Sequence, residues 1–495
     1  MAGPSRLLEI GSAEGKWVVT ATVLGSGVAM LNGTDVSVAL PAIGRDLGAD
    51  VSALQWILNG YMVTLAALIL VGGSLGDRYG RRRIYVVGVA WFSAASLLCA
   101  LAPTTEWLVA ARVLQGVGAA LLTPGSLALL QACFVPDDRS TAIGAWSGLT
   151  GIAAALGPVL GGALVDGLGW RWIFVLPLPL AGAAVWATLR HVPESRDPTP
   201  PPLDLAGAVL AVGTLGALTY PIIAVPGSGW SPTSVMLAVL GVVLLAAFIL
   251  RERNATAPML PFSIFASRQF TAANAATFAV YAALGGVFFL LVVHLQTVVG
   301  YSATAAGAAT MPIMALLLVG SPYAGRLAQR RGPRLPLTIG PALLAAAMLM
   351  MGGIEAGDGY LLGVLPSLIV FGIGLTLTVT PVTATVLAAV EDRHAGLASG
   401  INNAVARTAQ LLAVASLPVL AGMSGDAFTD SAAFADGFAI AMAITAGLSL
   451  LGAAVGWFFI RDDVLESAPG RETVELRHCG VEAPPDLSSV ERSMQ

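Results

Sequence analysis

The 495-residue sequence has little charge and almost no lysine. Only 11% of its residues are Asp, Glu, Lys or Arg, whereas a soluble protein carries about 25%. Lys16 is the only lysine, and Trp17 follows it. A phosphate-binding loop of the Gly-x-x-x-x-Gly-Lys-Ser/Thr type is therefore impossible in this chain. If the protein moves solutes uphill, it must draw on an ion gradient or on a separate motor subunit.

Cysteine and histidine are also scarce. The three cysteines (Cys99, Cys133 and Cys479) and the four histidines are too scattered for a disulfide framework or a metal cluster. The apolar segments contain no nucleophile–base pair that the sequence reveals, so an integral-membrane enzyme is the least favoured class. We therefore expect no enzymatic activity, no cofactor, no metal site and no nucleic-acid partner.

Long apolar segments dominate what remains. Hydrophobic residues make up 56% of the chain, and the mean hydropathy is +0.81. Segments of roughly 19 to 27 residues recur to the end, each long enough to cross about 30 Å of hydrocarbon. Such spans are expected to be helices, because a helix satisfies its own backbone in lipid. Fourteen spans are predicted, near 17–43, 52–74, 84–102, 106–130, 141–164, 170–190, 203–224, 233–251, 270–298, 304–325, 335–353, 360–381, 395–421 and 435–460.

The distribution of arginine predicts the orientation of these spans. With the N-terminus in the cytoplasm, nearly all arginines fall in cytoplasmic segments. Outside remain only Arg45 and Arg171, and Arg112 and Arg407 fall within spans. Because cytoplasmic loops carry the excess of Lys and Arg, we expect a multi-pass protein of the cytoplasmic membrane with both termini inside the cell.

Two proline-containing linkers divide the spans into six, two and six. The stretch 191–202 holds a run of prolines and reads as a stiff linker. A second cytoplasmic stretch, 252–269, carries Pro258 and Pro261. The predicted organisation is a cytoplasmic segment 1–16, a six-helix bundle 17–190, a linker 191–202, two extra helices 203–251, a linker 252–269, a second six-helix bundle 270–460 and a disordered cytoplasmic tail 461–495.

The two sets of six spans repeat one another. The loop Gly73–Arg83 and the loop Gly325–Arg334 share Gly, Leu, Arg, Gly and Arg at matching offsets. Gly116-Val117-Gly118 is likewise echoed by Gly372-Ile373-Gly374. Repeated halves are typical of secondary transporters, whose substrate site lies near the midplane between them.

The loop after the second span resembles the signature loop of the major facilitator superfamily. The fourth and fifth spans, with Arg112-x-x-Gln115-Gly116 and Gly157-Pro158-x-x-Gly161-Gly162, resemble motifs of its fourteen-span drug:proton antiporter family. This resemblance covers about residues 17 to 460. It implies an all-α major-facilitator-type membrane fold with two six-helix bundles and two extra transmembrane helices between them. It also implies export of small molecules by alternating access.

Two of these motifs carry expected roles in gating. The signature loop resembles a latch whose ion pairs form in one state and break in another, although it could be a simple positive-inside anchor. The fifth-span motif is typical of exporters, and its small residues let helices approach closely; plain helix packing is the alternative. The expected gating residues are Gly73, Asp77, Arg78, Gly80, Arg81 and Arg82, and the expected exporter-motif residues are Gly144, Gly157, Pro158, Gly161 and Gly162.

Asp35 is the one carboxylate predicted to lie deep within a span. Charge at that depth costs several kcal/mol, so such a residue indicates a functional site. Arg112 is its expected partner, because the first and fourth spans of this fold should face one cavity. The family's own aspartate aligns with Asn32, one helical turn away on the same face. Either Asp35 takes over proton coupling from that position, or coupling is altered or lost.

The substrate is less well determined. The spans offer one acidic residue, whereas Arg407 places a positive charge in the thirteenth span. This favours neutral, singly cationic or anionic amphiphiles over dications. The leading prediction is proton-coupled export of drugs, antibiotics or metabolites by a monomer; a lipid or glycolipid translocase is the alternative, and a nutrient importer stays possible. The expected cavity residues are Gln115, Asn402, Asn403, Arg407 and Gln410.

Overall fold

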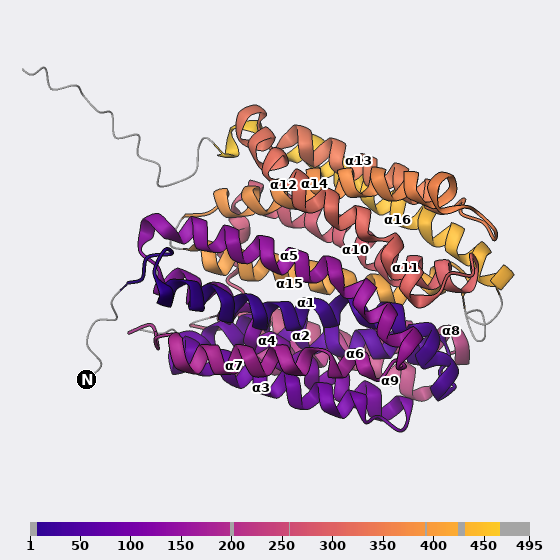
Figure 1. Cartoon of the computed structure of the whole chain (residues 1–495), viewed down its shortest axis with the longest axis horizontal. Coiled ribbons are helices and arrows are strands. Elements are labelled where there is room, and N and C mark those ends of the chain that lie inside the picture. The colour runs from indigo at the N-terminus through magenta and orange to yellow at the C-terminus, as the bar shows by residue number, and fades with distance from the viewer. Residues whose placement is uncertain (1–6, 199–201, 257, 392–393, 424–430, 466–495) are drawn as a thin grey trace, which may run out of the picture.

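The computed structural model describes residues 7–198, 202–256, 258–391, 394–423 and 431–465. In these ranges the chain forms helices joined by short loops (Figure 1). The first six residues of the predicted N-terminal segment, and the predicted disordered tail from residue 466 onward, lie outside the described residues.

The helices follow the predicted order of six, two and six spans. The first group is α1 (Ala13–Leu47), α2 (Val51–Tyr79), α3 (Arg81–Ala100), α4 (Thr105–Cys133), α5 (Pro136–Gly167) and the consecutive α6 (Trp172–Val175) and α7 (Pro177–His191). A hairpin of α8 (Leu205–Ser228) and α9 (Pro232–Asn254) comes next. The last group, entered through η1 (Phe262–Ala266) and closed by η5 (Asp462–Leu465), is α10 (Arg268–Thr297), α11 (Ala303–Ala309) with α12 (Met311–Arg331), α13 (Arg334–Met351), η2 (Tyr360–Val364) with α14 (Leu365–Ala388), α15 (Ala395–Leu420) and α16 (Ser431–Phe459).

By length and composition, 13 helical segments of the described chain could cross a membrane. The two parts of α1, Ala13–Gly33 and Asp35–Leu47, meet at a bend of 41° and together make the fourteenth. The bend therefore separates Asn32 from Asp35. The predicted fold class is confirmed, and the count of spans agrees with the prediction when the bent helix is taken as one span.

Proline accounts for two breaks that the apolar pattern did not predict. The span expected near 170–190 divides into α6 and α7, and Pro177 is the first residue of α7. The span expected near 304–325 divides at Thr310, and Pro312 lies in the first turn of α12. Proline has no backbone N–H to donate, so it is tolerated at the start of a helix and disfavoured inside one.

Glycine sets how closely the helices of the first bundle approach. A Cβ on Gly116 would lie 2.3 Å from the carbonyl oxygen of Tyr61 on α2, and one on Gly118 would lie 2.6 Å from the backbone nitrogen of Phe92 on α3. The Gly116-x-Gly118 pair thus lets α4 contact α2 with one face and α3 with the other. Small residues at helix contacts are the usual means of close packing in membranes.

Apolar packing joins the two bundles at one end of the molecule. One cluster of buried side chains there includes Leu40 and Ile43 of α1 together with Leu290 and Leu291 of α10. Toward the opposite end, the buried clusters belong mainly to one bundle each, around Phe92 in the first and Phe270 in the second. In Figure 1 most helices of the second bundle, such as α12, α13, α14 and α16, lie above those of the first, whereas α15 is drawn between α5 and α1.

The extra hairpin packs beside the junction of the bundles. Helices α8 and α9 pack against each other, and α8 also contacts α2 and α15. The hydroxyl of Ser52, at the start of α2, donates to the carbonyl oxygen of Ile223, near the end of α8. The start of α8 therefore lies toward the end of α2, at the end of the molecule that holds the signature loop.

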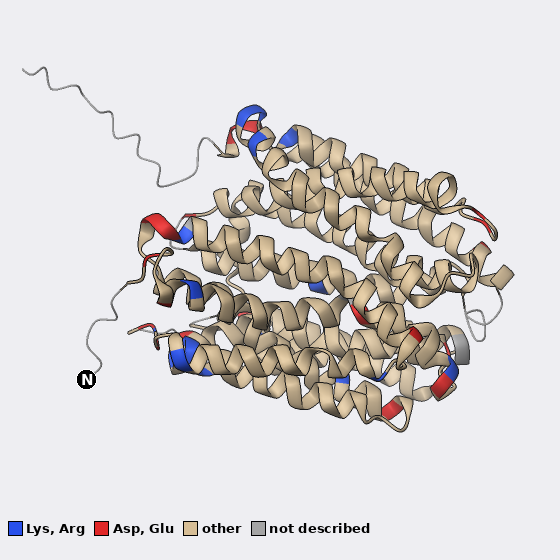
Figure 2. Cartoon of the chain, viewed as in Figure 1, with Lys and Arg blue, Asp and Glu red and all other residues tan. Residues whose placement is uncertain are grey.

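Charge is concentrated at the ends of the helices. Figure 2 shows that most Lys and Arg segments gather at the end where the N-terminus is drawn. This placement agrees with the arginine asymmetry of the sequence. The end that holds the N-terminus and the signature loop is called the inner end below, and the opposite end the outer end.

Candidate functional site

Arg112 lies at the centre of a buried polar cluster in the first bundle. Its side chain is only 1% exposed. Nη1 donates to the amide oxygen of Asn32 on α1 and to that of Gln115 on α4. Nε donates to the carbonyl oxygen of Ile57 on α2 at 3.0 Å. A buried guanidinium needs acceptors for its donors, and here three helices supply them.

Gln115 and Tyr61 complete the surroundings of this arginine. The amide nitrogen of Gln115 donates to the hydroxyl of Ser96 on α3 at 2.6 Å. The guanidinium carbon of Arg112 lies 4.4 Å from the centre of the Tyr61 ring, in a cation–π arrangement. Gln115, expected to line the substrate cavity, is fully buried here. Its amide oxygen accepts from Arg112 on α4 and its amide nitrogen donates to Ser96 on α3, so Gln115 orients Arg112 from inside the bundle.

Asp35 is fully buried on the far side of the bend in α1. Its side chain lies against α5, where a Cβ added to Gly161 would come within 3.0 Å of the Asp35 Cβ and 3.1 Å of its Cγ. Gly161 therefore provides the room that Asp35 occupies, which gives one glycine of the exporter motif a definite role. The sequence suggested Asp35 as partner of Arg112. The arginine donates to Asn32, which precedes the bend in α1, whereas Asp35 follows it.

The signature loop forms a local network at the inner end. Asp77 makes an ion pair with Arg81 at 2.8 Å, one turn along the same stretch. Gly80 adopts φ +110°, and a Cβ there would lie 2.7 Å from the carboxylate of Glu194. Oxygens of Glu194 accept from the backbone nitrogens of Arg82 and Arg83.

The linker after α7 is held against this loop by further bonds. Arg82 donates to the carbonyl oxygen of Val192 at 3.0 Å, and the backbone nitrogen of Arg81 donates to the carbonyl oxygen of Ser195 at 2.8 Å. Of the other expected gating residues, Arg78 lies 6.0 Å from the ring centre of Tyr79. A Cβ at Gly73 would make only an ordinary contact, 3.7 Å from Pro124. In this state, the described bonds of the loop lie within the first bundle and its linker.

The exporter motif lies where α5 meets α11. A Cβ on Gly162 would lie 2.4 Å from the carbonyl oxygen of Ala303, and one on Gly307 would lie 2.0 Å from that of Pro158. The two helices therefore cross with their backbones in contact. Gly144, at the other end of the predicted motif, has open space around its Cα. Gly161 and Gly162 therefore lie at close contacts that leave no room for a side chain, whereas a Cβ on Gly144 would meet open space.

Within the described ranges, hydrogen bonds join the two bundles at the outer end in three places. Asp166, near the end of α5, accepts from the backbone nitrogens of Ala303 and Thr304 at the start of α11. Gln296 of α10 donates to the carbonyl oxygen of Val38 at 2.9 Å. Gln55 of α2 donates to the carbonyl oxygens of Val414 and Ala415 on α15. Together with the shared apolar cluster, these bonds close the outer end of the molecule.

The second bundle contributes a partly exposed polar strip on α15. Arg407 donates to the amide oxygen of Gln410 at 3.0 Å. Asn403 is exposed. Asn402 instead turns to α10, where it donates to Asn274 and Thr277. Of the residues of α15 expected in the cavity, Asn403 is exposed, and Asn402, Arg407 and Gln410 are partly exposed.

Asn59 is a candidate that sequence reasoning missed. It is fully buried, and neither its amide nitrogen nor its amide oxygen has a hydrogen-bond partner. It follows Gln55 by one turn of α2, so it shares the face that meets α15. Farther along that face, Leu70 lies beside Gly400 of α15. Buried polar groups are rarely left unpaired, so this amide is suited to bind water or substrate between the bundles. In the sequence, the signal for Asn59 is the unusual polarity of this face of α2, where Gln55 and Asn59 lie one turn apart.

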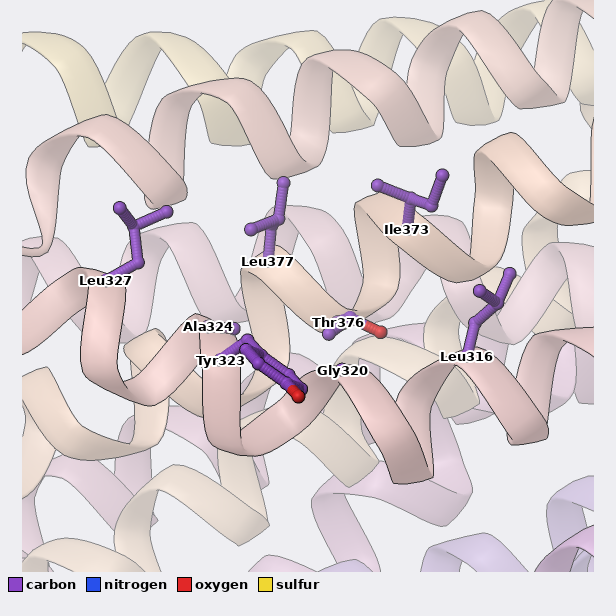
Figure 3. A pocket seen from close by; sticks show the side chains of 8 residues that line it. All are labelled: Leu316, Gly320, Tyr323, Ala324, Leu327, Ile373, Thr376 and Leu377. Atoms are coloured by element: carbon purple, nitrogen blue, oxygen red, sulfur yellow. The ribbon is translucent and has the colours of Figure 1, made fainter.

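Apolar cavities open between helices elsewhere. A cavity of about 550 Å³ lies between α5 and α11–α12, beside Leu156, Met311 and Tyr360. A smaller one of about 220 Å³ lies between α12 and α14 (Figure 3), where Leu316, Leu327, Ile373 and Leu377 line a groove with Tyr323. Neither includes the Arg112 cluster. Among the described residues, no group of three or more His, Cys, Asp and Glu could hold a metal ion.

Comparison with known proteins gives a consistent result. The family model described as "Major Facilitator Superfamily" matches residues 22–414. The chain is 34% identical over 415 residues to the "Tetracenomycin C resistance and export protein" of Streptomyces glaucescens, covering 83% of this chain and 77% of that protein. It is 35% identical over 459 residues to the "Puromycin resistance protein pur8" of Streptomyces alboniger, covering 90% and 91%. It is 34% identical over 468 residues to the "Methylenomycin A resistance protein" of Bacillus subtilis, covering 93% and 97%.

Solved structures with low sequence identity share the fold. A D-xylose–proton symporter superposes with a TM-score of 0.64 at 15% identity, covering 90% of this chain and 98% of that one. A bacterial homologue of the lysosomal transporter Spinster, in an inward-facing and unoccupied conformation, gives a TM-score of 0.64 at 17% identity, covering 90% and 97%.

Proposed function

Because the chain belongs to the major facilitator superfamily, we propose that it exports small amphipathic antibiotics or similar compounds in exchange for protons. The chain is a multi-pass membrane transporter and not an enzyme. The outward direction of transport, the class of substrate and the proton as coupling ion are therefore proposed.

The names of the relatives support the substrate class. One relative is named for resistance to and export of tetracenomycin C, and the others for resistance to puromycin and methylenomycin A. The polar groups between the bundles fit such compounds, because Arg407 supplies positive charge and Asn59 and Asn403 supply neutral hydrogen-bonding groups. A lipid or glycolipid translocase, the alternative from the sequence, gains no support from these relatives.

The observation that carries the coupling mechanism is the buried cluster of Arg112 with Asn32, next to the buried Asp35. Burial favours the protonated form of a carboxyl group, and a positive charge favours the ionised form. A motion of α1 about its bend would change the distance between Asp35 and Arg112. We propose that Asp35 takes a proton when the site faces outward and releases it when the site faces inward. One proton charge supplies about 2.3 kcal/mol per 100 mV of membrane potential.

The closed outer end supports assigning this structure to the inward-facing side of the cycle. The bonds of Asp166, Gln296 and Gln55 would then break when the outer end opens. The signature loop, whose Asp77 ion pair lies within the first bundle here, would exchange partners when the inner end closes. This assignment requires that both termini and the signature loop lie in the cytoplasm. It also places the protein, as a monomer, in the cytoplasmic membrane of the cell.

Transport by an Asp35→Asn variant tests the coupling. Purified protein is placed in proteoliposomes, a pH gradient is imposed, and uptake of a labelled antibiotic is measured. We expect the gradient to lose its effect while exchange of substrate across the membrane without a gradient continues. Asp46→Asn serves as a matched control, because Asp46 is half-exposed in an ion pair with Arg171 at the outer end. A pH gradient that drives the Asp35→Asn variant at the wild-type rate would disprove the role of Asp35.

A drug-susceptibility panel tests the substrate class. The gene is expressed in a host that lacks its own exporters, and the inhibitory concentrations of structurally varied antibiotics are compared with those for Asp35→Asn. Resistance to small aromatic or amphipathic antibiotics is expected. Unchanged susceptibility to all compounds, with the protein present in the membrane, would count against export.

A further inference from the structure

A pair of buried carboxyl groups lies at the inner end of the extra hairpin, outside the transport machinery described above. Asp204 is the residue before α8, and Glu252 is in the last turn of α9. The side chain of Asp204 is 3% exposed, and Glu252 is 2% exposed. Carboxyl groups are almost never this buried without partners, so the pair requires a physical explanation.

Each carboxyl group has one oxygen with partners and one without. Oδ1 of Asp204 accepts from the backbone nitrogen of Gly207 at 2.9 Å and from Arg251 at 3.3 Å. Oε2 of Glu252 accepts from the backbone nitrogen of Leu260 at 2.7 Å. Oδ2 of Asp204 and Oε1 of Glu252 are both buried and have no hydrogen-bond partner.

The two remaining oxygens face the same point. A Cβ added to Gly207 would lie 2.6 Å from Oε1 of Glu252 and 2.9 Å from Oδ2 of Asp204. Glycine at this position therefore leaves the space between the carboxyl groups open. Two acceptors that face each other in a buried site repel, whereas an acid and a carboxylate in the same place form a charge-assisted hydrogen bond.

The charges around the pair show a surplus of one negative charge. Among the residues that the structure describes, the charged groups that act on Glu252 are Asp204, which precedes α8, and Arg251 on α9. Arg251 forms an ion pair with Asp204, so it can balance one of the two carboxylates. A second, uncompensated carboxylate would be costly at this degree of burial. A single proton removes both problems at once, because it neutralises Glu252 and supplies the missing donor.

We infer that Asp204 and Glu252 form a proton-binding site. Glu252 holds the proton on Oε1 and donates it to Oδ2 of Asp204, while its Oε2 continues to accept from Leu260. The site links the start of α8, the end of α9 and the linker that leads through η1 into the second bundle. It holds its proton independently of Asp35, and raising the inner pH removes that proton and separates these three elements.

Infrared spectroscopy tests the inference directly. Full-length protein in lipid is titrated from acidic to alkaline pH, and the carbonyl band of protonated carboxyl groups is recorded for the wild type, Glu252→Gln and Asp204→Asn. We expect the wild type to show, at neutral pH, the band of one protonated carboxyl group that both variants lack. In Glu252→Gln the acid is gone, and its amide can replace both hydrogen bonds. In Asp204→Asn the charge of Arg251 is free to balance Glu252, which then ionises.

Stability gives a second, independent measurement. The native wild type binds one more proton than the unfolded chain at neutral pH, so its unfolding temperature should fall as pH rises. Glu252→Gln should lose this part of the pH dependence, and Asp46→Asn, which alters an exposed ion pair with no surplus charge, should keep it. Identical bands in the wild type and Glu252→Gln at every pH would overturn the inference. Stabilisation of the wild type, and not of Glu252→Gln, by Na⁺ or Mg²⁺ would also overturn it, since the site would then hold a metal cation.

Discussion

Arg112 donates a hydrogen bond to the amide oxygen of Asn32, at the position where the family pattern places an aspartate. The arginine is therefore held on α1 by a neutral group. The buried carboxyl group of Asp35 lies beyond a bend of 41°, against Gly161 of α5. Under the proposed coupling by Asp35, this arrangement would separate two tasks, binding the arginine and carrying a proton, that a single aspartate at position 32 would combine.

Returning a carboxylate to position 32 should compensate for its loss at position 35. In the Asp35→Asn background, Asn32→Asp places a negative charge directly on Arg112. We expect the double variant to recover part of the pH-driven transport that Asp35→Asn loses. The measurement is uptake in proteoliposomes with an imposed pH gradient. If the double variant is as inactive as Asp35→Asn while remaining folded, the location of the carboxylate matters more than its presence in this cluster.

Lysine should not replace Arg112. The guanidinium donates to Asn32, Gln115 and the carbonyl oxygen of Ile57 at once, and a lysine ammonium cannot reproduce this planar set of donors. We expect Arg112→Lys to reduce transport at least about tenfold, which corresponds to about 1.4 kcal/mol. Arg171→Lys, in an exposed outer ion pair, is the control and should transport normally. Equal activity of both variants would show that charge alone suffices at position 112.

Alanine should change labelling at one glycine of α5 and leave it unchanged at another. Gly162→Ala brings a Cβ to 2.4 Å from the carbonyl oxygen of Ala303 and must push α5 away from α11. We expect it to shift the protein toward the state with an open outer end, measured as faster labelling of a cysteine introduced at Thr304. Gly144→Ala meets open space and should leave labelling unchanged, with a small gain in stability of about 0.4 to 1 kcal/mol. Slower or unchanged labelling in Gly162→Ala would contradict the packing argument.

The signature loop should be sensitive at Gly80 and tolerant at Gly73. At Gly80, φ is +110° and the Glu194 carboxylate occupies the place of a Cβ, so Gly80→Ala strains the backbone and displaces Glu194. The expected loss of stability is about 1 to 3 kcal/mol, measured by thermal unfolding in detergent. Gly73→Ala makes only an ordinary contact at 3.7 Å and should unfold at the wild-type temperature. A similar loss for both would mean that the conformation of Gly80 is not what matters.

Asn59→Leu should separate stability from function. The native amide is buried with neither polar atom hydrogen-bonded, so an apolar side chain of similar size removes a desolvation cost. We expect a higher unfolding temperature and weaker transport, because the group that meets substrate or water between the bundles is lost. The control is Asn274→Leu, which removes bonds that are made with Phe270 and Asn402 and should lower the unfolding temperature. A fully active Asn59→Leu protein would exclude Asn59 from the transport site.

Much of the fold followed from the sequence, because bilayer thickness and backbone hydrogen bonding allow few solutions. Apolar segments of sufficient length had to be helices. The distribution of arginine predicted which helix ends lie on the cytoplasmic side. The small residues of the fifth-span motif predicted that helices approach closely there, and a Cβ on Gly162 would indeed lie only 2.4 Å from the carbonyl oxygen of Ala303. The breaks before Pro177 and at Thr310 were missed, because hydropathy is averaged over many residues and does not register one missing backbone donor.

The polar site was only partly predictable. Arg112, Asn32 and Asp35 stood out because charge and amide groups are rare in such segments. Which of them touch depends on the bend in α1, and a bend changes the direction of side chains on either side without any change in spacing. Asn59 and the Asp204–Glu252 pair were missed for a related reason: their significance lies in unpaired oxygens and nitrogens, and pairing is decided by residues distant in the chain.

The sequence by itself determined the class of protein, the number and order of the membrane helices and the residues able to carry charge within them. These properties depend on local composition, to which the bilayer responds segment by segment. Only the tertiary structure decided that Arg112 binds Asn32, that Gly161 makes room for Asp35, and that the bundles are joined at the outer end. Those relationships depend on how helices cross and bend, and crossings are set by close contacts such as that between Gly307 and Pro158.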